Sequence, residues 1–197
     1  MRPKGVEKGE TVQRILDVAT ELIQTRGYSA ISYHDIAERL GIRKASIHYH
    51  FPGKADLGKA VIERYRDAFK AVLDGILAAP EINTREALRR YCEPFRLVVH
   101  TQDRVCLCAA LAGEILAMPK EMQVEVEAFF TTHQRWIEAI LSRGLARGDI
   151  ALRAPAATTA RMIFSSLQGA VLVCRAIHDT AQLDDTIAAI LAGLAER

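Results

Sequence analysis

The 197-residue sequence is poor in aromatic side chains, which make up only 6% of it, and no run of eighteen apolar residues occurs in it. A helix that crosses a membrane needs about 20 predominantly apolar residues, so we expect no transmembrane segment and no membrane partner. The first eleven residues are polar and charged and lack the apolar core of a signal peptide. These absences favour a cytoplasmic protein.

Catalytic and metal-binding signatures are also missing. We find no Gly-rich phosphate loop, no Ser-x-x-Lys, no His-Glu-x-x-His and no nucleophile elbow, so we predict neither an enzyme nor a cofactor. The four cysteines are expected to be free thiols in a reducing compartment. Cys106 and Cys108 lie near His100, but structural zinc sites need C-x₂₋₄-C pairs and a second pair of ligands. No metal site is predicted.

The composition that remains is typical of an all-α protein. Half of the residues are hydrophobic, Ala and Leu are abundant, and few alternating β-branched runs occur. Helical periodicity predicts helices over residues 10–27, 33–40, 43–50, 54–79, 84–100, 105–116, 120–148, 155–178 and 183–195. Residues 1–9 are expected to form a disordered polar arm. We divide the chain into a small domain, residues 1–56, and a larger helical domain, residues 57–197.

The stretch from Ser32 to Asp56 contains two short helical patterns joined by a tight turn. Ser32 suits an N-cap, and Asp35 can close a capping box with it. Gly41 is expected to end the first helix in a left-handed conformation, and Pro52-Gly53 to stop the second. A helix, a turn of three to four residues and a second helix form the arrangement that places its second helix in a DNA major groove.

The second helix of this pair carries cations and hydrogen-bonding side chains without an acidic residue. Cations attract phosphates, whereas hydroxyl, imidazole and guanidinium groups reach base edges or backbone oxygens. Ile47 and Phe51, four residues apart, are expected to dock this helix on its own domain. The alternative is a short solvated helix in an all-α protein. The candidate DNA-binding residues are Ser32, Tyr33, Arg43, Lys44, Ala45, Ser46, His48, Tyr49, His50 and Lys54.

Residues 10–57 resemble the DNA-binding domain of the TetR (tetracycline repressor) family of transcriptional regulators. The matching positions are Ile15-Leu16-Asp17-Val18-Ala19, the Arg26-Gly27-Tyr28 turn, Ile36-Ala37, the run from Gly41 to Phe51, and Lys54-Ala55-Asp56-Leu57. One position departs from the pattern: His48 stands where the family most often has Tyr. The phosphate contact usually made by that Tyr therefore falls to Tyr49 or His48.

The resemblance implies a regulator, a repressor rather than an activator, that dimerises on a pseudo-palindromic DNA operator and leaves it when a small-molecule effector binds. The helix over residues 54–79 would connect the DNA reader to the effector-binding and dimerisation domain. One alternative is a redox or electrophile sensor that uses Cys106 or Cys108. Another, of a different class, is a helical thiol enzyme, which is weak because no base stands convincingly beside any cysteine.

The effector pocket is expected in the C-terminal domain. Binding pockets are mostly hydrophobic with few polar groups. The candidate residues are Phe95, Cys106, Leu111, Glu114, Phe129, His133 and Trp136. Glu114, a charge in an apolar stretch, would meet either the effector or an internal arginine such as Arg135 or Arg161, and we favour the arginine. Pro94 should bend its helix, either as tolerated packing, which we favour, or to open a cavity.

The dimer interface is expected on the last two long helices. Their apolar stripes exceed what one small core needs, although part of each stripe must pack within the chain. The candidate interface residues are Ile163, Leu167, Val171, Ile187, Ile190, Leu191 and Leu194. We expect four helices at the interface, two from each subunit.

Overall fold

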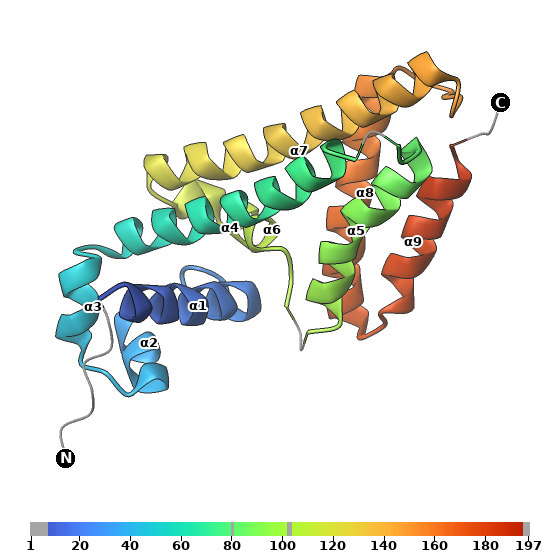
Figure 1. The fold of residues 1–197 in the computed structure, drawn as a ribbon. Helices are drawn as coiled ribbons and strands as arrows, with labels where there is room; N and C mark the ends of the chain where they lie inside the picture. Colours follow the sequence, from blue (N-terminus) through green and yellow to red (C-terminus); the bar gives the residue numbers. More distant parts are fainter. Residues whose placement is uncertain (1–7, 80, 102–103, 195–197) are drawn as a thin grey trace.

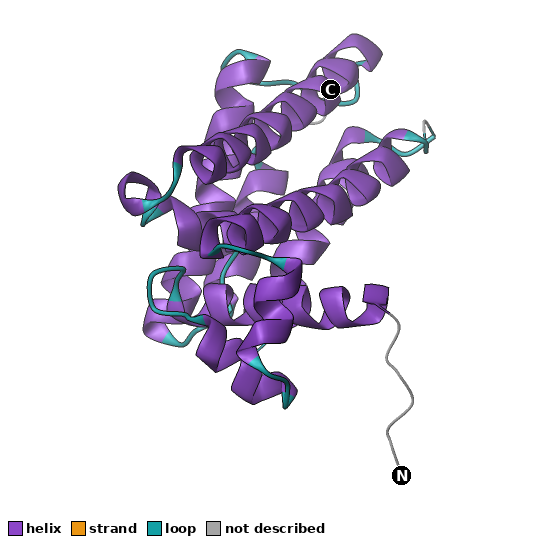
Figure 2. Ribbon diagram, turned by 90° about the vertical axis from the view of Figure 1, so that its left-hand side faces the viewer, coloured by secondary structure: helices purple, strands orange, loops and turns teal. Residues whose placement is uncertain are grey.

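The structure, a computed structural model, describes residues 8–79, 81–101 and 104–194. Its regular elements are all helical, which confirms the all-α prediction. They are α1 (Lys8–Arg26), α2 (Tyr33–Leu40), α3 (Lys44–His50), α4 (Lys54–Leu77), α5 (Thr84–Val99), α6 (Leu107–Ala112), the 3₁₀ turn η1 (Ile115–Ala117), α7 (Lys120–Arg147), α8 (Ala156–Ile177) and α9 (Ala181–Ala192). Loops connect these helices (Figure 2).

The two longest helices, α4 and α7, pack side by side, and the other helices gather at their two ends (Figure 1). α1, α2 and α3 lie under the N-terminal half of α4. α5, α8 and α9 stand together at the opposite end, and α6 lies between these groups. The N-terminal helices therefore project from a larger helical body, as the sequence predicted.

Local sequence signals determine the geometry of α2 and α3. The Ser32 hydroxyl accepts hydrogen bonds from the amides of His34 and Asp35, and the Asp35 carboxylate accepts one from the Ser32 amide at 2.7 Å. Gly41 ends α2 with φ +65°, a left-handed conformation that only glycine adopts without steric cost. Ile47 is fully buried. The predicted capping box, left-handed turn and docking residue are all confirmed.

α4 has 24 residues and ends two residues before the predicted end of the connecting helix, which was residue 79. Its N-terminal half packs on α1. There, the Arg64 guanidinium binds Asp17 Oδ1 at 2.7 Å and donates to Thr20 Oγ1 at 3.1 Å. α7 runs along most of α4, from Gly58, which lies against Met122, and the far half of α4 also packs on α5. A movement of α4 relative to α7 would therefore act directly on α1.

Several helix boundaries differ from the predictions by a few residues. α1 begins at Lys8, inside the predicted arm, of which residues 1–7 lie outside the described residues. α5 begins at Thr84, as predicted, and Asn83 caps it, because the Asn83 side-chain oxygen Oδ1 accepts from the Glu86 amide at 2.8 Å. α6 is shorter than predicted, because the chain leaves the helix at Gly113 and Glu114 and continues as a 3₁₀ turn.

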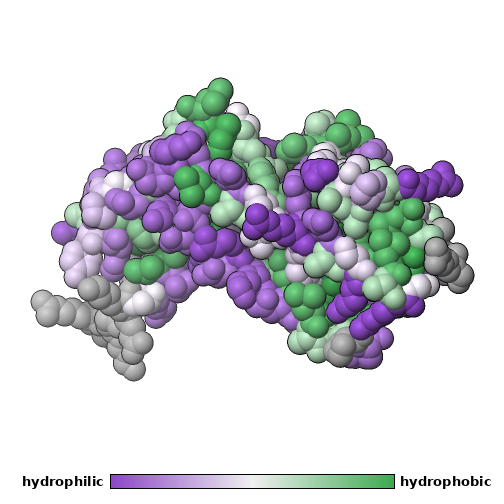
Figure 3. Space-filling view, turned by 90° about the horizontal axis from the view of Figure 1, so that it is seen from above, coloured by the Kyte–Doolittle hydropathy of each residue, from purple (hydrophilic) through white to green (hydrophobic). Residues whose placement is uncertain are grey.

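The surface seen from above is largely hydrophilic, with apolar residues gathered in separate clusters (Figure 3). Among the described helices, α8 is the one whose length and apolar composition would allow it to cross a membrane. It packs on both α7 and α9 in this fold. A core helix of a soluble protein can have the same length and apolar composition, so α8 is weak evidence for a membrane segment.

Candidate nucleic-acid interface and ligand-binding region

Helix α3 presents one polar face to solvent. Arg43, at its N-cap, and Lys44, Ala45, His48 and Tyr49 are all exposed, the Tyr49 side chain to 68%. Ser46 and His50 are half-buried at its flanks. Two fixed cations, hydroxyls and imidazoles thus share a surface that has no acidic residue within the helix. This surface can bind phosphates and hydrogen-bond to base edges.

The structure corrects the prediction that Tyr33 contacts DNA. Tyr33 is 8% exposed, and its hydroxyl donates a hydrogen bond of 2.8 Å to the Phe51 carbonyl. Burial raises the pKa of Tyr33 to about 12, and the nearby Asp56 charge adds to this shift. The ring also meets His48 edge-on, with centroids 4.6 Å apart. Tyr33 therefore holds α2 against the end of α3 and positions the reader surface.

Lys54 is also turned toward the protein. Its Nζ lies 4.4 Å from the centroid of the Tyr28 ring and 3.5 Å from the Ser29 carbonyl oxygen. Partial burial lowers the pKa of Lys54, although the charges of Glu114 and Asp35 oppose this effect. The ammonium group thus stabilises the loop between α1 and α2. Ser32, in contrast, remains exposed while its hydroxyl caps α2.

The structure also corrects the role of Glu114, which meets neither an arginine nor the predicted pocket. Its two carboxylate oxygens accept hydrogen bonds from the backbone amides of Tyr28 at 2.7 Å and Ser29 at 2.8 Å. Partial burial tends to raise the pKa of Glu114, but these bonds and the Lys54 charge outweigh it, so the pKa is lowered. Glu114 therefore ties the C-terminal body to the loop that follows α1.

Two further contacts hold the C-terminal end of α1 to the larger body. The Gln24 side-chain amide donates to the Val105 carbonyl at 3.0 Å, before α6. The Arg175 guanidinium, from α8, donates to the Gln24 and Thr25 carbonyls. A cation beside the last carbonyls of a helix is stabilised by the helix dipole. We call Gln24, Val105, Glu114 and Arg175 the α1 junction. No local pattern of residues indicates that these four side chains and segments meet.

Gly27 is required at the α1 junction for two separate reasons. Its φ is +87°, and a Cβ atom built on it would lie 2.5 Å from Glu114 Oε1. Gly148 has a similar φ of +74° but no atom within 4 Å of such a Cβ. Gly27→Ala should thus lower the free energy of unfolding by about 1–2 kcal/mol more than Gly148→Ala, because it also breaks charged hydrogen bonds. Urea unfolding of both variants measures this difference, and equal losses would contradict the role given to Glu114.

A buried aromatic cluster joins α4, α5 and α7. His133 and Tyr91 are each 1% exposed and share a hydrogen bond of 2.7 Å between the Tyr91 hydroxyl and His133 Nδ1. Phe129 packs on His133 with centroids 4.2 Å apart, and Trp136 stacks on Tyr91 at 5.1 Å. Phe95 is buried beside Tyr91. The structure thus brings together four of the predicted pocket residues, and Tyr91 is the partner that we did not assign to the site.

The buried imidazole should make stability depend on pH. Burial lowers the pKa of His133 to about 3, below the ordinary value of about 6.5. Between these values only the unfolded chain takes up this proton, so stability decreases as pH falls from about 6.5. At pH 5 the free energy of unfolding should therefore be about 2 kcal/mol lower than at pH 7.5. Urea unfolding of His133→Phe at both pH values should lack this loss, whereas His34→Phe, at an exposed site, should keep it. An unchanged pH dependence in His133→Phe would contradict the assignment.

Comparison with known proteins decides the family. The model for bacterial regulatory proteins of the tetR family matches residues 15–61. The model for the tetracyclin repressor-like C-terminal domain matches residues 84–190, more than half of the chain. The chain belongs to the TetR family. Regulators of this family are soluble DNA-binding proteins, and the family is not one of enzymes.

Individual relatives agree with this assignment. A TetR-family transcriptional regulator from Agrobacterium tumefaciens is 32% identical, with a TM-score of 0.90 over 96% of this chain and 100% of that one. A TetR regulator from Legionella pneumophila is 29% identical, with a TM-score of 0.84 over 98% and 100% of the two chains. The transcriptional regulator AcuR of Cereibacter sphaeroides is 24% identical over 174 residues, or 87% of this chain and 80% of that protein. This TetR-family chain is a DNA-binding transcriptional regulator.

The cysteines of this TetR-family chain are all buried. Burial raises the pKa of Cys92 to about 12 and raises the pKa of Cys108 and Cys174 as well. Cys106 accepts a hydrogen bond from the Gln168 amide at 3.5 Å and lies 3.7 Å from the Tyr65 hydroxyl. Neither the thiol sensor nor the thiol enzyme gains support, since thiols react when they are exposed and ionised.

The predicted dimer residues occupy the inner faces of α8 and α9. Six of the seven are buried within their own chain: Ile163, Leu167, Val171, Ile187, Ile190 and Leu194. Leu191 is partly buried. The structure therefore corrects this assignment for the six buried residues, which belong to the core of their own chain, whereas an interface role for Leu191 stays a prediction. Sequence periodicity identified the buried stripe of each helix but could not tell whether the same chain or a partner covers it.

Proposed function

We propose that this chain is a cytoplasmic homodimeric repressor that a small-molecule effector releases from a pseudo-palindromic operator. The α1 junction supports this most directly. It links the helix that carries α2 and α3 to segments on both sides of α6 and to α8. A ligand that binds one arrangement of these segments better than another shifts the population between the two, and with it the spacing of the reader helices.

The reader surface in this proposal is the exposed face of α3. Arg43 and Lys44 would bind phosphates or guanine edges, and His48 and Tyr49 would lie against the backbone or the bases. Ala45 leaves room for close approach. Ser32, Ser46 and His50 complete the set at its edges. Tyr33 and Lys54 are not part of the proposed reader surface, since both side chains contact their own domain.

The effector would bind in the C-terminal body. Phe95, Phe129, His133 and Trp136 would form an aromatic wall of its pocket, and Cys106 and Leu111 would lie behind that wall. Most of these side chains are fully buried, so an effector would enter where the cluster meets the surface. Burial keeps His133 neutral at pH 7, which favours an uncharged contact there.

The dimer would form through the outer faces of α8 and α9. Met162, Leu172, Val173 and Ile177 are large apolar side chains of α8 that are 42–56% exposed. Gly169 lies among them, with open space where a Cβ would be. Apolar side chains around a small residue allow two helices to approach closely. Two symmetric copies would place the reader helices in successive major grooves, about 34 Å apart.

The test is a fluorescence anisotropy titration of DNA from the region upstream of the chain's own coding sequence. We expect tight binding with two or more chains per duplex, and release by at least one compound from a small-molecule library. Compounds that release DNA should also change the fluorescence of Trp136, the only tryptophan. Binding of single chains, or tight binding that no compound in the library reverses, would count against the proposal.

A further inference from the structure

An apolar groove runs between α4 and α5 on the surface of the C-terminal body. Its volume is about 560 Å³, within the range of small-molecule sites. Six of its lining residues are apolar or aromatic and two are charged. They are Tyr65, Ala68, Phe69, Val72, Pro94, Leu97, Arg90 and Glu93.

The groove leaves large apolar side chains in water. Leu97 is 71% exposed and Val72 is 37% exposed. Pro94 stands inside α5, where a proline removes the hydrogen bond to the carbonyl four residues earlier, that of Arg90. The groove reaches inward to Phe69, which packs on His133 of the aromatic cluster. An occupant of the groove would thus cover exposed apolar surface and touch the wall of the cluster.

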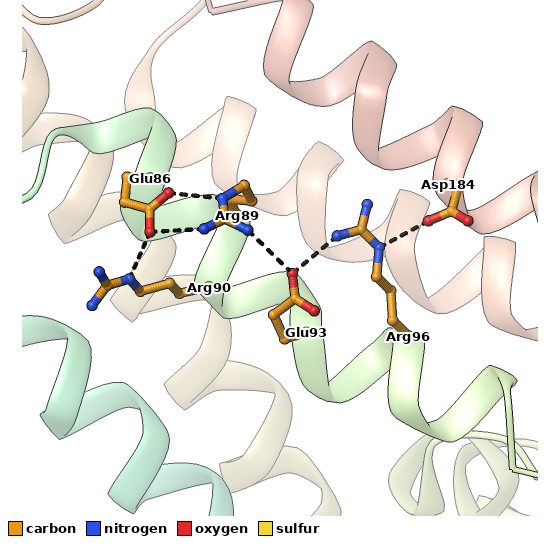
Figure 4. Close-up of polar contacts among 6 residues, drawn as sticks. All are labelled: Glu86, Arg89, Arg90, Glu93, Arg96 and Asp184. Carbon is orange, nitrogen blue, oxygen red and sulfur yellow. Dashed lines mark hydrogen bonds and ion pairs between the residues drawn. The ribbon is translucent and has the colours of Figure 1, made fainter.

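The charged side chains at the rim of the groove differ in how many of their polar atoms have a partner (Figure 4). Glu93 Oε1 lies 3.0 Å from Arg96 Nη1 and 3.8 Å from Arg89 Nη1, so two arginines neutralise the one acid of the groove. Arg90 binds Glu86 through Nε alone, at 2.7 Å. In the part of the chain that the structure describes, neither terminal nitrogen of Arg90 has a partner. Figure 4 shows this end of Arg90 extending from α5 away from the rest of the network.

We infer that this groove binds an elongated apolar molecule that ends in a carboxylate. The apolar part would lie on Phe69, Val72 and Leu97, and the carboxylate would accept hydrogen bonds from the two terminal nitrogens of Arg90. A guanidinium presents two parallel N–H donors that match the two oxygens of a carboxylate. Its Nε bond to Glu86 holds the guanidinium in place, so little freedom is lost on binding.

The charge of α5 selects an acid over an amine or a neutral molecule. The helix carries four arginines and two glutamates along its length, so its field favours an anion. A cationic ligand would find Glu93 already paired, and a neutral ligand would leave the Arg90 donors unmatched. Binding of the acid does not depend on the proposed function. Only its effect does: an acid bound between α4 and α5 would shift α4 and, with it, α1.

The binding test uses decanoate, with 1-decanol and decylamine as probes of the same chain length, and isothermal titration calorimetry of the full chain at pH 7.5. Decanoate should bind the wild type at least tenfold more tightly than either other probe. Arg90→Gln should weaken decanoate binding at least tenfold and leave decanol binding unchanged. Arg135→Gln is the control, since it removes the same charge from an exposed position on α7 that does not line the groove, and its effect should stay within about twofold.

Leu97→Glu tests the apolar part of the groove, and it should abolish decanoate binding by placing a second carboxylate there. Equal losses in the Arg90 and Arg135 variants, or decanol binding as tight as decanoate, would overturn the inference. DNA binding by the ligand-free protein is measured separately by anisotropy. A protein that binds decanoate in this way but no DNA would refute the proposed function and leave the inference standing. A protein that binds DNA but not decanoate would refute the inference and leave the proposed function standing.

Discussion

Val173→Asp is expected to convert the proposed dimer into monomers of 21.8 kDa and to lower operator affinity at least a hundredfold. Val173 lies on the outer face of α8 and is 42% exposed. Two-fold symmetry places the new carboxylate in the interface twice, and a buried unpaired charge costs several kcal/mol. Each monomer would keep only one reader helix, so about half of the contacts to DNA would be lost. Sedimentation equilibrium gives the mass and anisotropy gives the affinity.

Leu116→Asp is the matched control for this variant. Leu116 is 95% exposed in the turn after α6, on a different part of the surface. The same change in charge and hydrophobicity there should leave both the dimer and the operator affinity intact. If Val173→Asp remained a dimer with full operator affinity, the outer face of α8 would not be the interface. If both variants were monomers, the effect would not be specific to that face.

Lys44→Ala should weaken operator binding by about 1–3 kcal/mol if the ammonium group reads a base, or by a smaller, sequence-independent amount if it binds phosphate. Lys44 is exposed in the first turn of α3, and the helix contains no acidic side chain that could neutralise it. Titrations at several salt concentrations separate the two cases. A phosphate contact lowers the slope of the logarithm of affinity against the logarithm of salt by about 1.

Lys70→Ala controls for the loss of one positive charge anywhere on the protein. Lys70 is exposed on α4 in the C-terminal body, where it pairs with Asp74. Its replacement should leave operator affinity and salt slope within error of the wild type. Unchanged operator affinity for both Lys44→Ala and Tyr49→Ala would reject α3 as the reader helix.

Local chemistry explains why the N-terminal helices could be predicted from the sequence. The Ser32–Asp35 capping box and the left-handed Gly41 involve residues at most a few positions apart, so the sequence contains all the information they need. The buried position of Ile47 follows in the same way from helical spacing. Tyr33 was misplaced because its partner, the Phe51 carbonyl, lies 18 residues away and has no side-chain signature.

Long-range contacts account for the other differences. Glu114 was expected to meet an arginine, but its partners are two backbone amides more than 80 residues earlier, which no residue pattern reveals. His133 was predicted to line the pocket, but its hydrogen bond to Tyr91 depends on how α5 packs on α7. The sequence shows that α8 and α9 each have an apolar face, but only the fold shows that most of that face is buried within the same chain.

The central claim is that this chain recognises a specific DNA sequence through α3. The most direct measurement is its affinity for a duplex from its own upstream region, relative to a duplex of equal length and scrambled sequence, at about 150 mM salt. Specific regulators bind their sites about 10³-fold or more tightly than other DNA, so a preference of at least that order is expected. The Lys44→Ala/Tyr49→Ala double variant should lose most of this preference. Equal affinity of the wild type for both duplexes would contradict the account.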